Sequence, residues 1–468
     1  MIQGPDNPDY SHFIPNESQV KPRKKIPGKR STYLSDRGRY FHKDNRIWYV
    51  NRAGQWINES HDEFTRYLHT ACGLSKSRKN GPSECDTEIV WIHQHNSVDI
   101  VTNLAGHFGP KVIEHGNLRI LCKNSPKLIV PVEGDYPIIT LLLSGMLEPE
   151  QYQHNLWWAA QAVDDLYNHR TTMGLASVYC GPVSAGKSLW QDLLTLVLGG
   201  RMARPYQFMS GQTSFNAHTF AAEHLMIEDE HSATDLKSRL ALGTAIKGLI
   251  ANEDKQVHAK YQTPFMAPPL FQRLSVSLNN ESSNVALLPP GDSSLDHKVS
   301  LYDVQCAPMP MPTGTSTEKE IFKAALLAEL PCFIWDLLNQ TKIPVEWRDN
   351  RFGLKAFRSK VILDIMEEHQ PEIKLLEYLD LLYFSENEHE FIKTEYHGAA
   401  KEGILSEIEA ELRHKDSPVK SSADDMLRGY GTLGNYLRKL LKSHPHRVSY
   451  RKCGPQRLFK IAPARVAI

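Results

Sequence analysis

A glycine-rich segment followed by lysine and serine carries the clearest chemistry in this 468-residue sequence. Gly181-Pro-Val-Ser-Ala-Gly-Lys-Ser188 has the residue spacing of a phosphate-binding loop (P-loop). Glycines let backbone N–H groups face phosphates, and the N-terminus of a following helix adds partial positive charge. The lysine of such a loop reaches the β- and γ-phosphates, and the serine hydroxyl ligates magnesium. The sequence therefore predicts a site for ATP and Mg²⁺ whose nucleotide-binding residues are Gly181, Ser184, Gly186, Lys187 and Ser188.

About forty residues later, an apolar run ends in three carboxylates, Glu228-Asp-Glu230. We predict that Asp229 orients magnesium through water, together with Ser188, and that Glu230 polarises the attacking water. Glu228 can replace either residue, because one sequence does not fix the register of an acidic triplet. An apolar strand that ends in acids is weak evidence alone, but it becomes strong at this distance from a P-loop.

A third strand is predicted at Leu274–Asn279, followed by a second asparagine. A side-chain amide at such a strand tip can hold the lytic water or sense the γ-phosphate. We favour Asn280 for this role, with Asn279 as the near alternative. A simple turn formed by the Asn-Asn pair is the competing interpretation.

Between the second and third motifs lies a short basic segment in which Lys255, His258 and Lys260 are the prominent side chains. The alternation of residues 255–260 indicates a hairpin with a basic and aromatic surface. Such a surface can follow a DNA strand by charge and by stacking. A solvated hairpin without a ligand is the alternative.

The elements around these motifs are those that a P-loop requires. A short strand precedes Gly181, and the amphipathic segment 188–198 is predicted as a helix that ends before Gly199-Gly200. Two more helices are predicted upstream, at 137–147 and 148–169. The pair Trp157-Trp158 lies at helical spacing beside other apolar residues, which favours a core position over base stacking.

The N-terminal third looks like a small mixed domain without recognisable chemistry. The sequence predicts a hairpin formed by 46–50 and 55–57, a helix at 62–72, and strands at 88–92 and 117–122. The first thirty residues are rich in Pro, Asn and Lys, a composition that cannot build a core and predicts a mobile arm.

The C-terminal region ends in a basic module. Helices are predicted at 317–340, 355–368, 374–385 and 404–413, followed by a polar linker and a basic amphipathic helix at 432–442. A hairpin around Gly454-Pro455 then completes a pattern typical of winged-helix DNA-binding modules. The predicted DNA contacts are Arg438, Lys439 and Lys442 near a groove and Arg451 and Lys452 at the wing tip. A protein-interaction wing or a basic solvated tail is the alternative.

Composition excludes several classes of protein. The 54 Lys and Arg balance the 54 Asp and Glu, but residues 1–30 carry +3 and residues 428–468 carry +10, so the remainder carries −13. This distribution indicates a local contact with a polyanion. Seven scattered cysteines without a Cys-x-x-Cys pair indicate reduced thiols in a cytoplasmic compartment, such as that of a bacterial host cell. The apolar runs are far shorter than the roughly 20 residues of a membrane helix, and no secretory signal pattern begins the sequence.

The order of the motifs (P-loop, acidic strand, basic hairpin, strand ending in Asn) resembles that of superfamily 3 helicases, especially primase-helicases and replication proteins of phages, plasmids and related mobile elements. The resemblance covers residues 130–370 and includes Glu133-Gly-Asp-Tyr-Pro-Ile-Ile, Glu329–Leu338 and Arg351-Phe-Gly. It implies an AAA+-like P-loop ATPase that translocates on single-stranded DNA as a ring, usually a homo-hexamer. A separate primase or polymerase is a further partner that the resemblance suggests.

The sequence departs from that family in two respects. The family usually places an arginine near the segment 290–299, where it reaches a neighbour's γ-phosphate, but this chain has Lys298 there. Lysine lacks the planar fork of arginine, so either Arg273 or Arg239 replaces it or hydrolysis is slow. The N-terminal region also lacks a clustered Asp-x-Asp metal site, so we predict no primer synthesis.

We therefore expect an α/β protein with a P-loop ATPase core, a small α+β N-terminal domain, helical flanking segments and a C-terminal winged-helix module. The expected function is that of an ATP-dependent DNA helicase or replication-initiation motor, with single-stranded DNA in the pore and duplex at the C-terminal module. The alternatives are an ATPase of defence or protein remodelling and a nucleotide-gated origin-binding protein. The expected divisions are an arm at 1–30, an N-terminal domain at 31–130, the ATPase core at 131–315, a helical domain at 316–414, a linker at 415–427 and the basic module at 428–468.

Overall fold

The computed structural model describes residues 37–79, 81–228, 236–250, 255–260, 262–279, 295–368, 371–385, 389–397, 399–428 and 432–463. The side chains of 236–240 and 367–368 are not among the described parts. The predicted arm at 1–30 and the predicted site residues Asp229, Glu230 and Asn280 lie outside the described residues.

The N-terminal part combines two small sheets with two helices. The first sheet is antiparallel with strand order β1-β2-β3, and the second has the order β4-β6-β5. The predicted hairpin, the helix after it and the strand near 117–122 are confirmed. The elements are η2 (Arg37–Arg39), β1 (Phe41–Lys43), β2 (Arg46–Val50), β3 (Trp56–Ser60), α2 (His61–Thr70), α3 (Glu84–His95), β4 (Ile100–Thr102), β5 (Lys111–His115) and β6 (Leu118–Cys122).

The strand predicted at 88–92 is wrong, because this segment lies inside α3. Ser83 caps that helix: its hydroxyl accepts the N–H of Asp86, and the Asp86 carboxylate accepts the N–H of Ser83. Ile89 and Ile92 then fall on one helical face and are buried in the core of the N-terminal part. The cap and the helical spacing therefore prevail over the strand preference of Ile-Val-Trp-Ile.

A five-stranded parallel sheet with the order β13-β7-β12-β9-β8 forms the centre of the molecule. Every residue of β7 is buried, and so is every residue of β12 except the last, as is usual for parallel strands covered on both faces. The strands end together at what we call the carboxyl edge, opposite the amino edge. They are β7 (Ala176–Gly181), β8 (Met202–Ala203), β9 (His224–Glu228), β12 (Arg273–Asn279) and β13 (Val299–Asp303).

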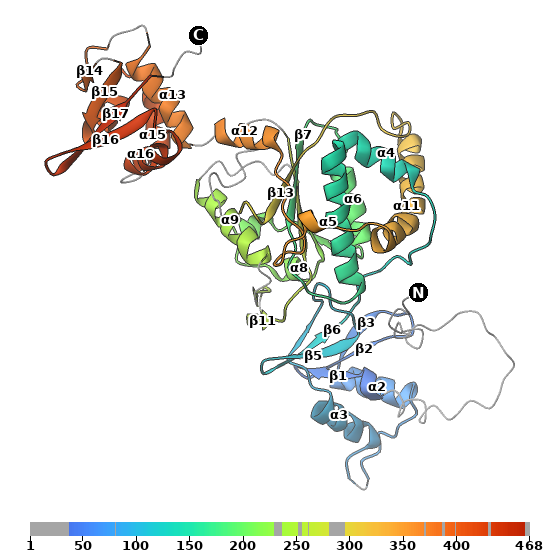
Figure 1. The fold of residues 1–468 in the computed structure, drawn as a ribbon. Coiled ribbons are helices and arrows are strands. Elements are labelled where there is room, and N and C mark those ends of the chain that lie inside the picture. Colours follow the sequence, from blue (N-terminus) through green and yellow to red (C-terminus); the bar gives the residue numbers. More distant parts are fainter. Residues whose placement is uncertain are drawn as a thin grey trace.

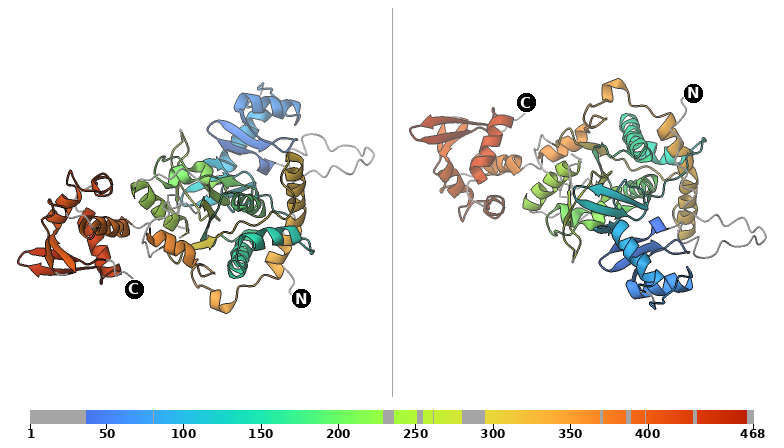
Figure 2. Two further views of the ribbon diagram at one scale, coloured as in Figure 1. Left: turned by 90° about the horizontal axis from the view of Figure 1, so that it is seen from above. Right: turned by 90° about the horizontal axis from the view of Figure 1, so that it is seen from below.

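Helices cover both faces of this sheet, with α6 and α9 on opposite sides (Figures 1 and 2). Trp157 and Trp158 are core residues, as predicted, and the indole N–H of Trp158 donates to the carbonyl of Leu175 at 2.8 Å. A small antiparallel hairpin, β10 with β11, stands apart from the sheet. The elements are α4 (Pro137–Met146), α5 (Pro149–Tyr167), α6 (Lys187–Val197), α7 (Tyr206–Met209), α8 (Ala217–Phe220), α9 (Leu236–Ile250), β10 (Lys255–Val257), β11 (Phe265–Ala267), α11 (Ser316–Asn339), η3 (Val345–Trp347) and α12 (Lys360–Glu368).

The long helix α11 belongs to the central core. Its Phe322 and Phe333 are buried in the same apolar cluster as the central sheet. Its Glu329 carboxylate accepts the N–H groups of Ile138 at 3.0 Å and Ile139 at 2.9 Å, at the start of α4. The structure therefore groups α11 with the sheet, whereas the sequence placed it in a helical domain at 316–414.

The C-terminal elements share a core of their own, and Figure 1 shows them apart from the central sheet. Their antiparallel sheet has the order β14-β15-β17-β16. The predicted helix at 432–442 and the hairpin around Gly454 are confirmed. The elements are α13 (Pro371–Tyr383), β14 (Glu395–His397), β15 (Ala400–Ile404), α14 (Leu405–Leu412), α15 (Lys420–Met426), α16 (Thr432–Ser443), β16 (Val448–Cys453) and β17 (Gln456–Ile461).

The linker predicted at 415–427 is wrong. This segment contains α15, and Val419, Ala423 and Leu427 are buried in the C-terminal core. These three residues are spaced four apart along the chain, so they lie on one face of a helical turn and can pack inward while the polar residues between them stay outside. The C-terminal unit consequently begins with α13, well before residue 428.

The N-terminal part docks on the amino edge of the central sheet through the loop after β4. In this loop the N–H of Ala105 donates to the Phe220 carbonyl at 2.9 Å, and the Ala105 carbonyl accepts the N–H of Phe271 at 3.2 Å. Gly106 has φ +76°, and a Cβ there would lie 2.4 Å from the Cβ of Phe271. Only glycine allows the two chain segments to approach this closely.

A buried carboxylate fixes the same contact. Glu223, which directly precedes β9, is fully buried and accepts the N–H of Gly106 at 2.7 Å. Arg201 pairs with the same carboxylate through Nε at 2.7 Å and through Nη2. The Arg201 guanidinium also donates to the carbonyls of Leu104 and Asn124. One ion pair therefore ties the central sheet to two points of the N-terminal part.

Candidate nucleotide site and nucleic-acid surfaces

The glycine-rich segment forms the turn between β7 and α6, which is the context that the sequence predicted. A Cβ at Gly181 would lie 2.2 Å from the carbonyl oxygen of Val304, so the end of β7 packs directly against the chain after β13. Ser184 and Gly186 both have left-handed backbone conformations, with φ +63° and +86°. Left-handed residues at every second position turn successive backbone N–H groups toward one concave space, which suits a bound anion. Gly186 is the N-cap of α6, and Ser188 is exposed on the first helical turn.

Lys187 is buried at the carboxyl edge, with a relative exposure of 6%. Its ammonium donates to the carbonyls of Gly181 at 2.8 Å and Pro182 at 2.6 Å, and to the side-chain oxygen of Asn279 at 3.1 Å. Asn279 is the last residue of β12, which lies next to β7 in the sheet. The structure thus brings the near alternative Asn279 to Lys187, while the role of Asn280 stays a prediction.

Carboxylates gather at the same edge. β9 lies parallel to β12 and ends at this edge with Glu228, whereas Asp229 and Glu230 lie outside the described residues. Glu228 pairs with Arg204, which directly follows β8. Asp192 on α6 lies near this pair, and its pKa is raised, first by burial and then by the negative charge of Glu228. Among the described residues, no group of three or more His, Cys, Asp or Glu is arranged to hold a metal ion.

These residues fit magnesium–ATP. The first turn of an α-helix has backbone N–H groups without intrahelical partners, which can bind a phosphate. Here the left-handed residues Ser184 and Gly186 bring the loop around the start of α6, where such a phosphate would lie. Lys187 and Ser188 stand on that turn, next to the acidic tip of β9. The arrangement therefore offers a cation, a hydroxyl and backbone donors for phosphates, with the Glu228 carboxylate at the same edge, two strands away from β7.

The predicted substitute Arg273, and Lys298 at the position where the family has its arginine, both lie at the opposite, amino edge of the sheet. Arg273 begins β12 at the amino edge, is 2% exposed, and donates to Asp165 at 2.7 Å. It is therefore a buried structural charge at the edge opposite the P-loop, and this candidate is wrong. Lys298 directly precedes β13, also at the amino edge, and its carbonyl accepts the N–H of Ala176 at 3.0 Å. The side chain of Arg239 is outside the described parts.

The basic hairpin is anchored on one side. Val257 of β10 and Ala267 of β11 are buried against residues of the N-terminal part, among them Leu104 and Ile120. The ammonium of Lys255 donates to the carbonyl of Leu249 near the end of α9 at 3.2 Å. Lys255 therefore acts first as a cation at a helix C-terminus, where it is favoured by the helix dipole.

The other side of the hairpin is open. Lys260 is exposed, and the ring of His258 lies 4.9 Å from the ring of Phe215. Phe215 is 41% exposed, although large apolar side chains are usually buried. Sequence reasoning missed Phe215, because it lies in the polar loop 211–216 and only the fold brings it to the hairpin. Its aromatic type in that polar loop was the one available signal.

The C-terminal unit separates the five predicted DNA-contact residues into two groups. Arg438 and Lys442 are exposed on α16. Lys439 pairs with the buried Glu372 at 3.1 Å, and Arg451 pairs with Glu402 at 2.9 Å. Lys439 and Arg451 are also exposed, but each is already paired with a buried carboxylate.

The wing presents a different arginine beside its fifth predicted residue. Lys452 lies directly opposite Arg457 across the β16–β17 hairpin. The Arg457 guanidinium lies over the Tyr450 ring, 5.0 Å from its centroid, and Tyr450 is 42% exposed. Because Tyr450 and Lys452 alternate with Arg451, they lie on the opposite face of the hairpin from it. Arg457 and Tyr450 thus form an exposed cation–aromatic pair on this hairpin, which the predicted contact residues did not include.

No helix among the described residues is long and apolar enough to cross a membrane.

No protein-family model matches the chain, and no curated protein matches it. Its fold is similar to the apo structure of the C-terminal region (305–718) of NrS-1, with a TM-score of 0.53 at 14% identity over 94% of this chain and 100% of that one. An A-form apo structure of the same region gives a TM-score of 0.52 at 13% identity, covering 93% and 99%. A ligand-bound JCV helicase covers 52% of this chain and 58% of its own at 12% identity, but its TM-score of 0.24 is too low to carry an argument. The similarity to the NrS-1 region concerns the fold: a mixed α/β protein built around a parallel sheet.

Proposed function

We propose that this chain is an ATP-dependent DNA motor of the superfamily 3 type, acting as a helicase or in replication initiation. The strongest support is the meeting of three separate motifs at one sheet edge. Lys187 contacts Asn279 at 3.1 Å, and the acidic tip of β9 lies on the next strand. Parallel strands of one sheet end at the same edge in any case, so the support lies in the residue types found there: a lysine, an amide and a carboxylate beside the turn 181–186.

The chain's own groups have distinct roles in hydrolysis. The loop 181–186 and the start of α6 hold the phosphates, Lys187 balances the charge that develops on the γ-phosphate, and Asn279 orients the lysine or the attacking water. Ser188 and, through water, Asp229 would hold magnesium, which when bound would withdraw charge from the phosphates. Glu230 positions a water that adds to the γ-phosphorus, while the bond from phosphorus to the bridging oxygen breaks and yields ADP and phosphate.

The DNA track follows from the exposed cations. Lys260 is exposed and His258 is half-buried at the hairpin, and Arg438, Lys442, Lys452 and Arg457 are exposed on the C-terminal unit. In a ring, single-stranded DNA would contact the hairpin and duplex would contact α16 and the wing. Phosphate contacts of this kind depend strongly on salt.

Steady-state hydrolysis of magnesium–ATP, measured with and without single-stranded DNA, tests this function. Wild type should be stimulated by DNA, and Lys187→Ala should lose turnover because the phosphate cation is gone. Lys319→Ala, on the exposed start of α11, is the matched control and should behave as wild type. Turnover that survives in Lys187→Ala would contradict the site, and turnover indifferent to DNA would contradict the motor.

A nucleotide-gated DNA-binding protein without unwinding activity is the second candidate. The observation that favours it is the burial of Arg273 against Asp165, which removes one substitute for the absent interface arginine. This function predicts ATP binding and sequence-specific duplex binding with very slow hydrolysis. A filter-binding measurement of ATP affinity beside the turnover assay distinguishes the two functions.

A further inference from the structure

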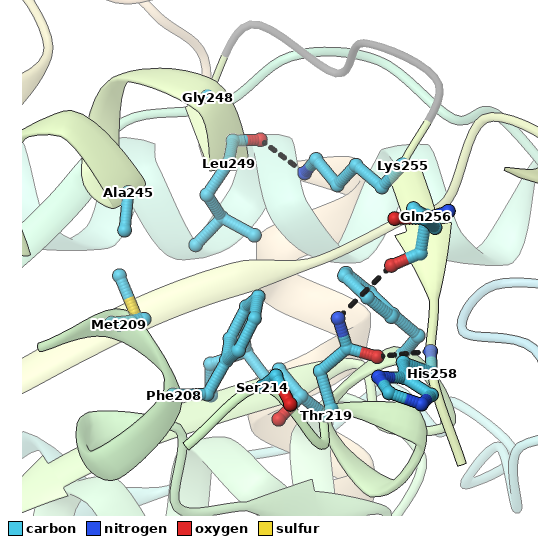
Figure 3. A pocket seen from close by; sticks show the side chains of 13 residues that line it. Phe208, Met209, Ser214, Thr219, Ala245, Gly248, Leu249, Lys255, Gln256 and His258 are labelled. Carbon is cyan, nitrogen blue, oxygen red and sulfur yellow. Dashed lines mark hydrogen bonds between the residues drawn. The ribbon is translucent and has the colours of Figure 1, made fainter. Parts of the chain in front are cut away.

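A cavity of about 460 Å³ lies beside the open side of the hairpin (Figure 3). Phe208, Phe220, Leu225, Ala245 and Leu249 contribute apolar walls. These residues come from α7, α8, β9 and α9, so four elements of the core enclose the space. The volume lies within the range of about 300–1,000 Å³ that is usual for ligand sites.

Hydrogen bonds hold the walls in place. The side-chain amide of Asn216 donates to the Gln256 carbonyl at 2.9 Å, and its oxygen accepts the N–H of His258 at 2.7 Å. Figure 3 shows both bonds, together with the contact of Lys255 with Leu249 on the other side of the cavity. These bonds fix β10 against α8 and α9, so the cavity is part of the folded structure.

The mouth of the cavity carries a different chemistry from its walls. Ser214 and Gln256 are exposed there, and His258 is half-buried. Phe215, in the same loop as Ser214, places its exposed ring beside the His258 ring, and the exposed Lys260 follows two residues later. Ser214, Gln256 and His258 thus give an apolar hollow a polar rim, and Phe215 stands beside His258 next to that rim.

We propose that this cavity receives one unstacked nucleobase of the DNA strand that the hairpin holds. A nucleobase is flat and aromatic, so it fits walls formed by Phe208 and Phe220, and its polar edge needs hydrogen-bonding groups such as those at the mouth. A base also remains attached to a phosphate, which Lys260 is placed to contact. The inference rests on the proposed function, because it requires a single strand to pass the hairpin.

Gly248 of α9 offers a direct way to fill the cavity. It lines the cavity, and a Cβ added to it meets no atom within 4 Å. Gly248→Leu therefore extends a side chain into the hollow without a collision at its base, and leucine favours the helix more than glycine does. Thr244→Leu is the matched control, because it adds the same side chain at an exposed position of the same helix.

The experiment compares the affinity of the full chain for an oligo-dT strand and for an abasic strand of equal length, by fluorescence anisotropy. Stacking of one base predicts that wild type binds oligo-dT roughly tenfold more tightly than the abasic strand. Gly248→Leu should lose this preference while its affinity for the abasic strand stays unchanged, and Thr244→Leu should keep the preference. Equal binding of both strands by wild type would overturn the inference, as would a preference that survives in Gly248→Leu.

The abasic strand separates this inference from the proposed function. If wild type binds neither strand, the motor is overturned and the base cavity with it, whereas binding of both strands with equal affinity overturns the cavity alone. A second measurement does not depend on the folding of a variant. Oligonucleotides that contain 5-iododeoxyuridine should crosslink to wild type within 208–220 or at His258, and crosslinks confined to other segments would contradict the proposal.

Discussion

The substitution Glu223→Gln tests how firmly the N-terminal part is docked on the central sheet. Glutamine has the shape of glutamate and can still accept the N–H of Gly106, but it removes the charge that pairs with Arg201. The Glu223 side chain is fully buried, and that of Arg201 is only 17% exposed. Loss of one partner therefore leaves a nearly desolvated guanidinium without a counter-charge.

The magnitude follows from the burial of this pair. Breaking a buried ion pair by removing one partner costs about 3–5 kcal/mol. Because Gly106 can keep its acceptor, we take the lower end, about 3 kcal/mol, for opening of the loop 103–109. At about 1.4 kcal/mol for each factor of ten, the opening equilibrium rises roughly 100-fold.

Hydrogen–deuterium exchange read by mass spectrometry measures this opening directly. The amides of Ala105 and Gly106 are hydrogen-bonded to Phe220 and Glu223, so their exchange should accelerate roughly 100-fold when exchange is limited by the opening equilibrium. Asp425→Asn is the matched control, because it makes the same chemical change in an exposed pair with Arg428. If exchange at 103–109 is unchanged in Glu223→Gln, the reasoning is refuted and the apolar contacts alone hold the loop.

Three further predictions concern acid stability and the basic surfaces. Burial lowers the pKa of His154 from 6.5 to about 4. The neutral side chain therefore contributes its full stability above pH 6.5, and this contribution is lost as the pH falls toward 4. The thermal unfolding midpoint should decline over that window, and it should decline less in His154→Asn. An equal decline in both proteins would contradict this. Lys255→Met should leave the affinity for single-stranded DNA unchanged, because the Lys255 ammonium is bonded to α9. Lys260→Met should weaken that affinity in the same anisotropy assay, because it removes an exposed positive charge. The reverse order would contradict the proposed DNA contact of Lys260. Arg457→Ala should reduce the slope of log affinity against log salt for duplex by about one, and Arg451→Ala should change it less because Glu402 already holds that side chain. Equal slopes in the two variants would count against the proposed wing face.

Local patterns predicted the elements around the P-loop well. The strand before Gly181, the helix after Gly186 and the strand that ends at Asn279 are all visible in the sequence, because glycine spacing and buried apolar runs are properties of adjacent residues. The strand predicted at 88–92 failed because its residues suit a strand, whereas the Ser83 cap and the burial of Ile89 and Ile92 on one helical face favour the helix.

The roles of charged residues depended on partners that are distant in sequence. Arg273 looked available for an interface, but Asp165 lies 108 residues away in the chain and is close only in the fold. Lys255 and Arg451 are similar cases, since α9 and Glu402 hold them. A cation can thus be recognised from sequence as a candidate DNA contact, but whether it is already engaged depends on tertiary structure.

The close approach at Gly106 also limits how domains of this kind can be exchanged. The loop 103–109, the residues 220–223 and Phe271 form a matched set, in which a single Cβ on the loop would displace the segment that leads into β12. A chimera that replaced the N-terminal part alone would keep only half of this set. An engineered exchange, or a natural recombination event, would have to carry both halves together or preserve the glycine, so the boundary of the transferable unit lies inside the central sheet.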